Sequence, residues 1–243
     1  GSDLIKACYP VLAEAARSVA TPQLRNAATL GGNLCQDVRC WYYRYPRHIG
    51  GPIQCLRKGK GTCLAVRGDN RYHAVMEGKK CFAVCPSDTA TALAALDARI
   101  CTAGPEGNRS IRVTDFYSPL SKTLQPGEIV TEVRIPKMPG AVDQRFLKFT
   151  LRKPVDFALA SVASVVVSED GICRDVRIAL GAAGPGPVRA SRAEEALIGK
   201  PINEANAAEA ADAAMAGARP LSKNGYKIEI IKTLIKRALL GGG

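Results

Sequence analysis

The hydrophobic positions near the start of the chain recur with the period of a helix. Residues 4–20 form one amphipathic run with an apolar face, and Thr21-Pro22 marks its end. A short glycine-containing segment follows over 24–34. Residues 35–85 follow neither a helical nor a strand period and are rich in Gly, Cys, Arg and Tyr, so we expect a long loop there.

After this loop the pattern changes to regular elements. A helix is predicted over 88–96, with Ser87 as the N-cap. A strand is predicted over 99–103, followed by a turn at 104–108, and another strand over 129–135. Three more strands are predicted over 145–151, 160–168 and 172–181, the last two joined by a turn at Glu169-Asp170-Gly171. Alanine-rich or amphipathic helices are predicted over 191–198, 204–218 and 226–240. The sequence therefore predicts an α+β protein with a domain boundary near residue 140.

The charge of the chain is concentrated in the predicted loop. The net charge is +12, and residues 39–80 contain ten Lys and Arg against Asp69 and Glu77. A basic block of this kind is typical of a nucleic-acid-binding surface or of a solvated face. No apolar run approaches the roughly 18 residues that span a bilayer, and the first residues lack a signal-peptide pattern. Gly1-Ser2 resembles a cloning remnant, so we expect the natural chain to begin earlier.

The same loop holds most of the cysteines. Six of the nine fall within 51 positions, at Cys35, Cys40, Cys55, Cys63, Cys81 and Cys85. The odd total and the lack of an export signal argue against a disulfide framework. A loop this long is unusual in a compact domain, and ligation by several cysteines is one way to order it.

The cysteine spacing leaves the ligand set and the metal open. Cys40, Cys55, Cys63 and Cys81 are separated by 14, 7 and 17 residues, unlike the close pairs of zinc ribbons. Close pairs also exist, since four residues separate Cys35 from Cys40 and three separate Cys81 from Cys85. Four thiolates suit either Zn²⁺ or an iron–sulfur cluster, with buried structural thiols as the simplest alternative. The surrounding cations favour the cluster, which carries excess negative charge.

Two further segments have cofactor chemistry. In Thr29-Leu30-Gly31-Gly32-Asn33 the paired glycines let backbone N–H groups approach a phosphate, and the Thr and Asn side chains can add hydrogen bonds. A Gly-Gly pair more often marks only a turn, and the segment is not the Rossmann fingerprint. Ser87-Asp88 opens a helix and is either a cap or a polar contact for a cofactor.

Together these residues resemble the medium, FAD-binding subunit of the xanthine dehydrogenase family of molybdenum hydroxylases. The resemblance keeps the family's order over nearly the whole chain. It rests on residues 23–34, 39–44, 72–74, 86–88, 152–160, 182–190 and 193–197. It implies that residues 1–140 form the second, C-terminal lobe of a PCMH-type FAD-binding domain, with a cysteine-rich insert at 35–85. Residues 141–243 would be a C-terminal medium-subunit domain with a three-stranded antiparallel sheet and a helical bundle.

The cysteine insert is similar to those of the 4-hydroxybenzoyl-CoA reductase β-subunit and the aldehyde oxidoreductase FAD subunit, which hold a [4Fe–4S] cluster. The reductase pattern puts a ligand near position 72, which is a tyrosine here. The aldehyde oxidoreductase pattern matches Cys81-Phe82-Ala83-Val84-Cys85-Pro86. The resemblance therefore implies Cys40, Cys55, Cys63 and Cys81 as ligands, with Cys35 or Cys85 as the alternative.

The resemblance also implies a set of flavin contacts. Thr29, Gly31, Gly32 and Asn33 would face the FAD diphosphate, and Asp88 would bind the ribityl or ribose region. Near the isoalloxazine it places Ile129 or Val130 and Lys148 or Lys153. The family's first phosphate loop, an Ala-Gly-Gly-Thr/Ser-Asp-Leu segment, is absent from this sequence, so we expect an incomplete FAD site.

These implications make the chain an electron-transfer subunit of an oxidoreductase. Substrate would react at a molybdenum–pterin large subunit, and electrons would pass through iron–sulfur centres, including a [2Fe–2S] small subunit, to FAD. No catalytic residue for the organic substrate is expected here. The rival interpretation is a zinc-stabilised basic nucleic-acid-binding module, which leaves the Gly-Gly-Asn and Ser-Asp segments unexplained. We expect no nucleic-acid partner, no membrane association and a cytoplasmic location, with periplasmic export alongside a partner as the alternative.

Overall fold

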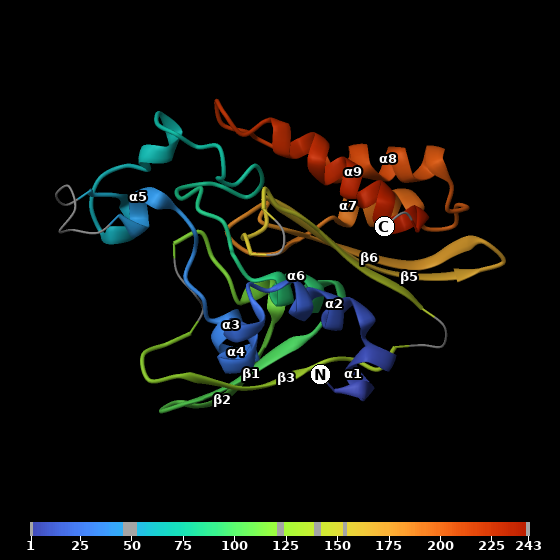
Figure 1. Cartoon of the computed structure of the whole chain (residues 1–243), viewed down its shortest axis with the longest axis horizontal. Helices are drawn as coiled ribbons and strands as arrows, with labels where there is room; N and C mark the ends of the chain where they lie inside the picture. Colours follow the sequence, from blue (N-terminus) through green and yellow to red (C-terminus); the bar gives the residue numbers. More distant parts are fainter. Residues whose placement is uncertain (1, 46–52, 121–123, 139–141, 153–154, 242–243) are drawn as a thin grey trace.

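The computed structural model describes residues 2–45, 53–120, 124–138, 142–152 and 155–241, and all structural statements concern these residues. Helices and sheets are stacked in layers (Figure 1). A four-stranded sheet carries three C-terminal helices on one face, while α2 (Pro10–Ser18) and α6 (Asp88–Ala95) pack on the other. A three-stranded sheet lies beyond these two helices, and the cysteine-rich segment projects at one end. The predicted α+β class with antiparallel sheets is confirmed.

The first predicted helix is in fact two helices. α1 (Asp3–Cys8) and α2 are separated at Tyr9, whose backbone has left the helical region with φ −137° and ψ 58°. The residue after it is Pro10, which disfavours helical geometry at the preceding position and has no N–H to donate. The apolar period therefore continues through a break that proline imposes.

The helix α6 lies at the centre of the molecule. Ser87 caps it as predicted, since its Oγ accepts a hydrogen bond from the Ala90 N–H at 3.1 Å. All eight residues of α6 are buried, between the two sheets. Beneath it the antiparallel sheet has the order β2-β1-β3, formed by β1 (Arg99–Gly104), β2 (Gly107–Arg112) and β3 (Ile129–Arg134). A short helix η3 (Val113–Asp115) follows β2.

The C-terminal sheet has four strands, not the predicted three. Its order is β4-β5-β6-β7, from β4 (Asp143–Phe149), β5 (Ala160–Glu169), β6 (Ile172–Gly181) and β7 (Val188–Arg189). The added strand β7 has two residues, too few for an alternating pattern to be read. The helices α7 (Ser191–Leu197), α8 (Glu204–Met215) and α9 (Tyr226–Leu240) agree with the predicted helical segments.

The central strand β5 joins two hydrophobic cores. Val162 and Val166 face a core shared with α8 and α9, whereas Ala163 and Val165 face a core shared with α2 and α6. Both faces of the strand are therefore covered, which accounts for its continuous apolar run. The second core combines residues from both sides of the predicted boundary near 140, and the boundary itself stays a prediction.

In their described parts, the glycine-containing and cysteine-rich segments contain only short helices. These are α3 (Pro22–Ala27), α4 (Leu30–Leu34), α5 (Trp41–Arg44), η1 (Leu56–Lys58) and η2 (Leu64–Val66). Most of the described cysteine-rich segment is irregular, as the sequence predicts. Within the described ranges, no helix combines the length and apolar character that crossing a membrane requires.

Candidate functional site

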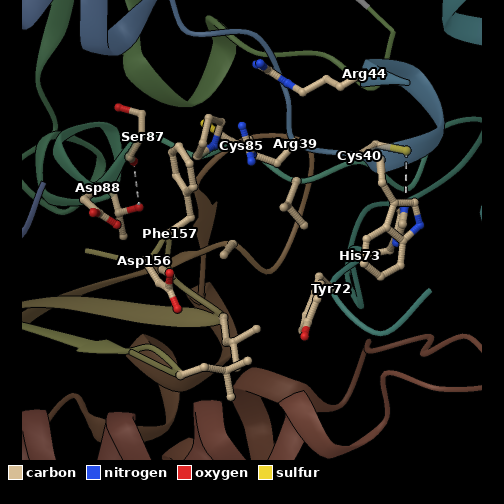
Figure 2. A pocket seen from close by; sticks show the side chains of 18 of the residues that line it. Arg39, Cys40, Arg44, Tyr72, His73, Cys85, Ser87, Asp88, Asp156 and Phe157 are labelled. Atoms are coloured by element: carbon tan, nitrogen blue, oxygen red, sulfur yellow. Dashed lines mark hydrogen bonds between the residues drawn. The ribbon is translucent and has the colours of Figure 1, made fainter. Parts of the chain in front are cut away.

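A cavity of about 790 Å³ lies between the cysteine-rich segment, the start of α6 and the segment that joins β4 to β5. Figure 2 shows Arg39 and Cys40 from the first, Ser87 and Asp88 from the second, and Phe157 from the third around this space. The volume is within the usual range for sites of small molecules and cofactors. The structure thus brings two regions that sequence patterns mark for cofactor chemistry to the walls of one cavity.

Asp88 lies in the wall of the cavity and is buried with a cation. Its carboxylate is 2.7 Å from Lys148 Nζ, and the two side chains are 7% and 9% exposed. Ser18 Oγ also donates to this carboxylate, at 3.4 Å. Burial raises the pKa of Asp88, and the Lys148 charge opposes that rise. Two residues that the resemblance assigns to different parts of FAD are therefore paired with each other here.

Buried hydrogen bonds join Asn33 to Ser87 and Thr89 at the start of α6, and this meeting point forms a corner of the site. Asn33 Oδ1 accepts from Ser87 Oγ and from Thr89 Oγ1, both at 2.6 Å. With Oδ1 committed twice, the other end of the amide is a donor, which suits a phosphate. The Gly-Gly-Asn segment and the Ser-Asp segment, 54 residues apart, are thereby locked together.

The remaining predicted phosphate contacts lie beside this corner, outside the lining of the large cavity. Thr29 caps α4, because its Oγ1 accepts from the Gly32 N–H at 3.0 Å. A Cβ at Gly32 would lie 3.1 Å from that hydroxyl, and one at Gly31 would lie 3.9 Å from the Val130 side chain. Glycine at these positions leaves the backbone of the exposed α4 turn open to a ligand.

The structure describes only one of the two predicted isoalloxazine contacts. Ile129 opens β3 and is 63% exposed, next to the Val130 that packs against α4, and it does not line the cavity. Lys153 lies outside the described residues. Neither prediction is tested by the geometry, and both stay predictions.

Sequence patterns alone do not identify the aromatic and cationic wall of the cavity. The Arg39 guanidinium lies 4.2 Å from the centroid of the Phe157 ring, a cation–π contact between segments far apart in sequence. Partial burial, with the nearby Arg44 charge, lowers the pKa of Arg39. Trp41 and Tyr72 add ring surface. The available signal is that all of these residues lie in segments that match the family, over 39–44, 72–74 and 152–160.

The four cysteines implied as ligands line a second, smaller pocket together. Cys40, Cys55, Cys63 and Cys81 come from four separate stretches of the segment, and Arg57 and Lys80 line the same pocket. Cys85 instead lines the large cavity. No group of three or more His, Cys, Asp or Glu side chains in the described parts of the chain is placed to hold a metal ion. The two observations differ because lining a pocket is a looser arrangement than coordinating one ion.

The surroundings of the cysteine pocket are polar and incompletely bonded. Arg57 Nε is buried and makes no hydrogen bond to any described residue, although the guanidinium donates to the Pro119 carbonyl at 2.7 Å. Burial raises the pKa of the Cys40 thiol, and nearby Cys63 and Cys81 add to the rise. Burial, with the Lys227 charge, lowers the pKa of His73 to about 4. Arg57 Nη1 lies 3.7 Å from Asp37 Oδ1, and the unbonded Nε beside four thiols suits a further anionic group.

Comparison with known proteins matches nearly the whole chain to flavoprotein domain families. Residues 2–138 match the family described as the FAD binding domain in molybdopterin dehydrogenase, and residues 145–241 match the CO dehydrogenase flavoprotein C-terminal domain. The aldehyde oxidoreductase FAD-binding subunit PaoB of Escherichia coli (strain K12) is 36% identical over 239 residues, which cover 95% of this chain and 70% of that protein. The carbon monoxide dehydrogenase medium chain of Hydrogenophaga pseudoflava is 27% identical, covering 98% and 68%.

Solved structures show the same fold. Carbon monoxide dehydrogenase from Hydrogenophaga pseudoflava superimposes with a TM-score of 0.73 at 26% identity, covering 99% of this chain and 69% of that one. Quinoline 2-oxidoreductase from Pseudomonas putida 86 gives 0.71 at 26% identity, covering 100% and 70%. From these matches and the site geometry, the chain belongs to the molybdopterin dehydrogenase FAD-binding family, as an oxidoreductase flavoprotein subunit of the molybdenum hydroxylases.

Proposed function

We propose that this chain is the electron-transfer subunit of a molybdenum-containing hydroxylase or reductase. In this role it holds FAD between α4, the start of α6 and the large cavity, and a [4Fe–4S] cluster at the cysteine pocket. It assembles with a molybdenum–pterin large subunit and a [2Fe–2S] small subunit. When bound, FAD and the cluster supply reversible electron transfer, and the protein supplies position and potential.

The names of the relatives support placing substrate chemistry on a partner. They specify an aldehyde oxidoreductase, a carbon monoxide dehydrogenase and a quinoline 2-oxidoreductase. These substrates differ widely, while the fold of the matching chain stays the same. A subunit that carries electrons from different substrate centres fits this pattern.

The observation that carries the cluster proposal is the shared pocket of Cys40, Cys55, Cys63 and Cys81. An all-thiolate cluster is anionic, and Arg57 and Lys80 in the same lining would offset its charge. The pocket holds only about 20 Å³, so ligation requires its lining to open. Coupling of metal binding to such local rearrangement is common.

The flavin proposal rests on the corner where Asn33 meets Ser87. The open backbone at Gly31 and Gly32 would let the diphosphate approach closely, and the Asn33 side-chain amide would donate to it. Asp88 would accept from a sugar or ribityl hydroxyl, and Lys148 opposes the rise that burial causes in the pKa of this carboxyl. Phe157 would cover an apolar edge of the cofactor and exclude water from it.

Single cysteine substitutions test the cluster proposal. Cys40→Ser and Cys81→Ser should lose most of the iron and sulfide that the anaerobically purified wild-type protein retains, because each removes one of four ligands. Cys8→Ser is the matched control, since Cys8 is exposed on α1, and should retain both. Full iron in the two variants, or its loss in Cys85→Ala instead of Cys81→Ser, would contradict the assigned ligand set.

A further inference from the structure

The stretch from Asn70 to Val75 carries no regular structure, yet the C-terminal domain holds it through many hydrogen bonds. Apart from Ala183, whose carbonyl accepts from the Val75 N–H, its partners in that domain lie between Arg219 and Lys227, before and at the start of α9. The bonds join Asn70 to Ser222 and Lys223, the Arg71 carbonyl to Tyr226 Oη, and the Val75 carbonyl to the Arg219 N–H. This connection fixes one side of the cysteine-rich segment to a helix of the other domain.

His73 lies at the middle of this connection. Its carbonyl accepts from Asn224 Nδ2 and from Lys227 Nζ, each at 3.1 Å. Asn224 and Lys227 are fully buried, and Lys227 also donates to the Ala182 carbonyl at 2.6 Å. A buried ammonium is costly unless hydrogen-bonded, so its use on a backbone carbonyl indicates that the position of His73 is strongly constrained.

The imidazole of His73 points at a cysteine from the small pocket. Its Nε2 lies 3.2 Å from Cys40 Sγ, as the dashed line in Figure 2 shows. His73 is buried, with 2% of the residue exposed. Its ring packs against the rings of Trp41 and Tyr42, whose centroids lie 5.9 and 6.1 Å from its own. Nδ1 is buried and has no hydrogen-bond partner in the described part of the chain. Within the described ranges, the polar contact of the ring is therefore the one with Cys40.

We infer that His73 donates a hydrogen bond from Nε2 to the Sγ of Cys40, held in place by Asn224 and Lys227 from the C-terminal domain, and so raises the reduction potential of a cluster bound there. This inference rests on the proposed cluster. A thiolate that ligates iron is only an acceptor, so Nε2 carries the hydrogen in either protonation state of the ring. Hydrogen bonds to ligand sulfurs stabilise the more negative, reduced state of a cluster.

A pair of substitutions at one position isolates the hydrogen bond. His73→Leu removes the donor, whereas His73→Gln removes the ring but keeps an N–H near the Nε2 position. In a redox titration followed by EPR on the anaerobic holoprotein, we expect His73→Leu to shift the midpoint potential downwards. The expected shift is at least a tenfold change in the reduction equilibrium, about 59 mV for a one-electron couple. His73→Gln should lie between wild type and His73→Leu.

The outcomes separate this inference from the proposed function. No iron in the wild-type protein would overturn the cluster and this inference with it. A wild-type cluster whose potential is unchanged in His73→Leu, or shifted equally in both variants, would overturn the hydrogen bond alone. If His73→Leu loses its cluster, ¹⁵N-histidine labelling of the wild type decides, because pulsed EPR of the reduced cluster must then show coupling to a histidine nitrogen. Absence of that coupling would also overturn the inference.

Asn224→Ala tests the positioning role without changing charge. It removes a donor to the His73 carbonyl and touches no cysteine, so we expect a smaller downward shift in potential with full iron content. Asn206→Ala is the matched control, because Asn206 Nδ2 also donates to a backbone carbonyl, that of Pro201, but outside this connection. Equal potentials in the two variants would show that Asn224 has a structural role only.

Discussion

The buried ion pair between Asp88 and Lys148 makes a quantitative prediction about stability. The pair joins α6 to β4 across the two domain matches, at 2.7 Å and with both side chains less than a tenth exposed. Lys148→Met keeps much of the side-chain volume but leaves the Asp88 carboxylate buried without its cation. Leaving one charge of such a pair uncompensated costs about 3–5 kcal/mol of unfolding free energy.

The loss should depend on pH in a defined direction. Burial already raises the pKa of Asp88, and removal of Lys148 raises it further. An acid whose folded pKa exceeds its unfolded value makes the protein less stable as pH rises through that interval. The deficit of Lys148→Met relative to wild type should therefore be largest near neutral pH. It should shrink in acid, where Asp88 becomes neutral.

Urea unfolding followed by circular dichroism provides the assay, with a double-mutant cycle. Asp88→Leu combined with Lys148→Met should cost less than the sum of the single changes by at least about 1.5 kcal/mol, since no buried charge remains. Lys6→Met is the control, because its pair with Asp3 is exposed at 46% and 96%. Exposed pairs contribute about 0–1 kcal/mol. Additive single effects, or a Lys148→Met loss no larger than that of Lys6→Met, would refute the reasoning.

Two further predictions concern buried positions elsewhere. Burial lowers the pKa of Lys227 to about 7, so unfolding takes up a proton at pH values between about 7 and the pKa of the unfolded chain. In that interval the unfolding free energy of the wild type should rise with pH more steeply than that of Lys227→Met, by up to about 1.4 kcal/mol per pH unit. Parallel pH profiles of the two proteins would contradict this. Gly181→Ala should cost about 1–3 kcal/mol in the same urea assay, because its Cβ would overlap Ser161 Oγ and Thr91 Oγ1 where α6 approaches β6. Gly217→Ala, whose Cβ would meet nothing within 4 Å, should be close to neutral.

The sequence predicts elements best where one strong local signal acts. The helix after Ser87 has a capping residue and an uninterrupted run of helix formers, and the strands before and after the Glu169-Asp170-Gly171 turn are long and apolar. The strand Gly107–Arg112 was missed because its side chains are polar and largely exposed, so no alternation marks it. The break at Tyr9 is predictable from Pro10, but the hydrophobic period alone takes no account of proline.

The candidate site could likewise be predicted from the sequence only in part. Cysteine spacing leaves two ligand sets open, and only the family resemblance favours the set that lines one pocket. The contacts of Asp88 with Lys148 and of His73 with Cys40 join residues 60 and 33 positions apart. Such pairs depend on how helices and loops pack, and no local pattern in a single sequence encodes them. The cation–π contact of Arg39 with Phe157 was unpredictable for the same reason.

The most direct test of the electron-transfer account is iron, acid-labile sulfide and zinc analysis of the anaerobically purified protein, together with its visible spectrum. The account predicts about four irons and four sulfides per chain, with broad absorbance at about 400 nm from the cluster. One zinc per chain and no iron would leave the family assignment standing. It would contradict the role of the cysteine pocket in carrying electrons.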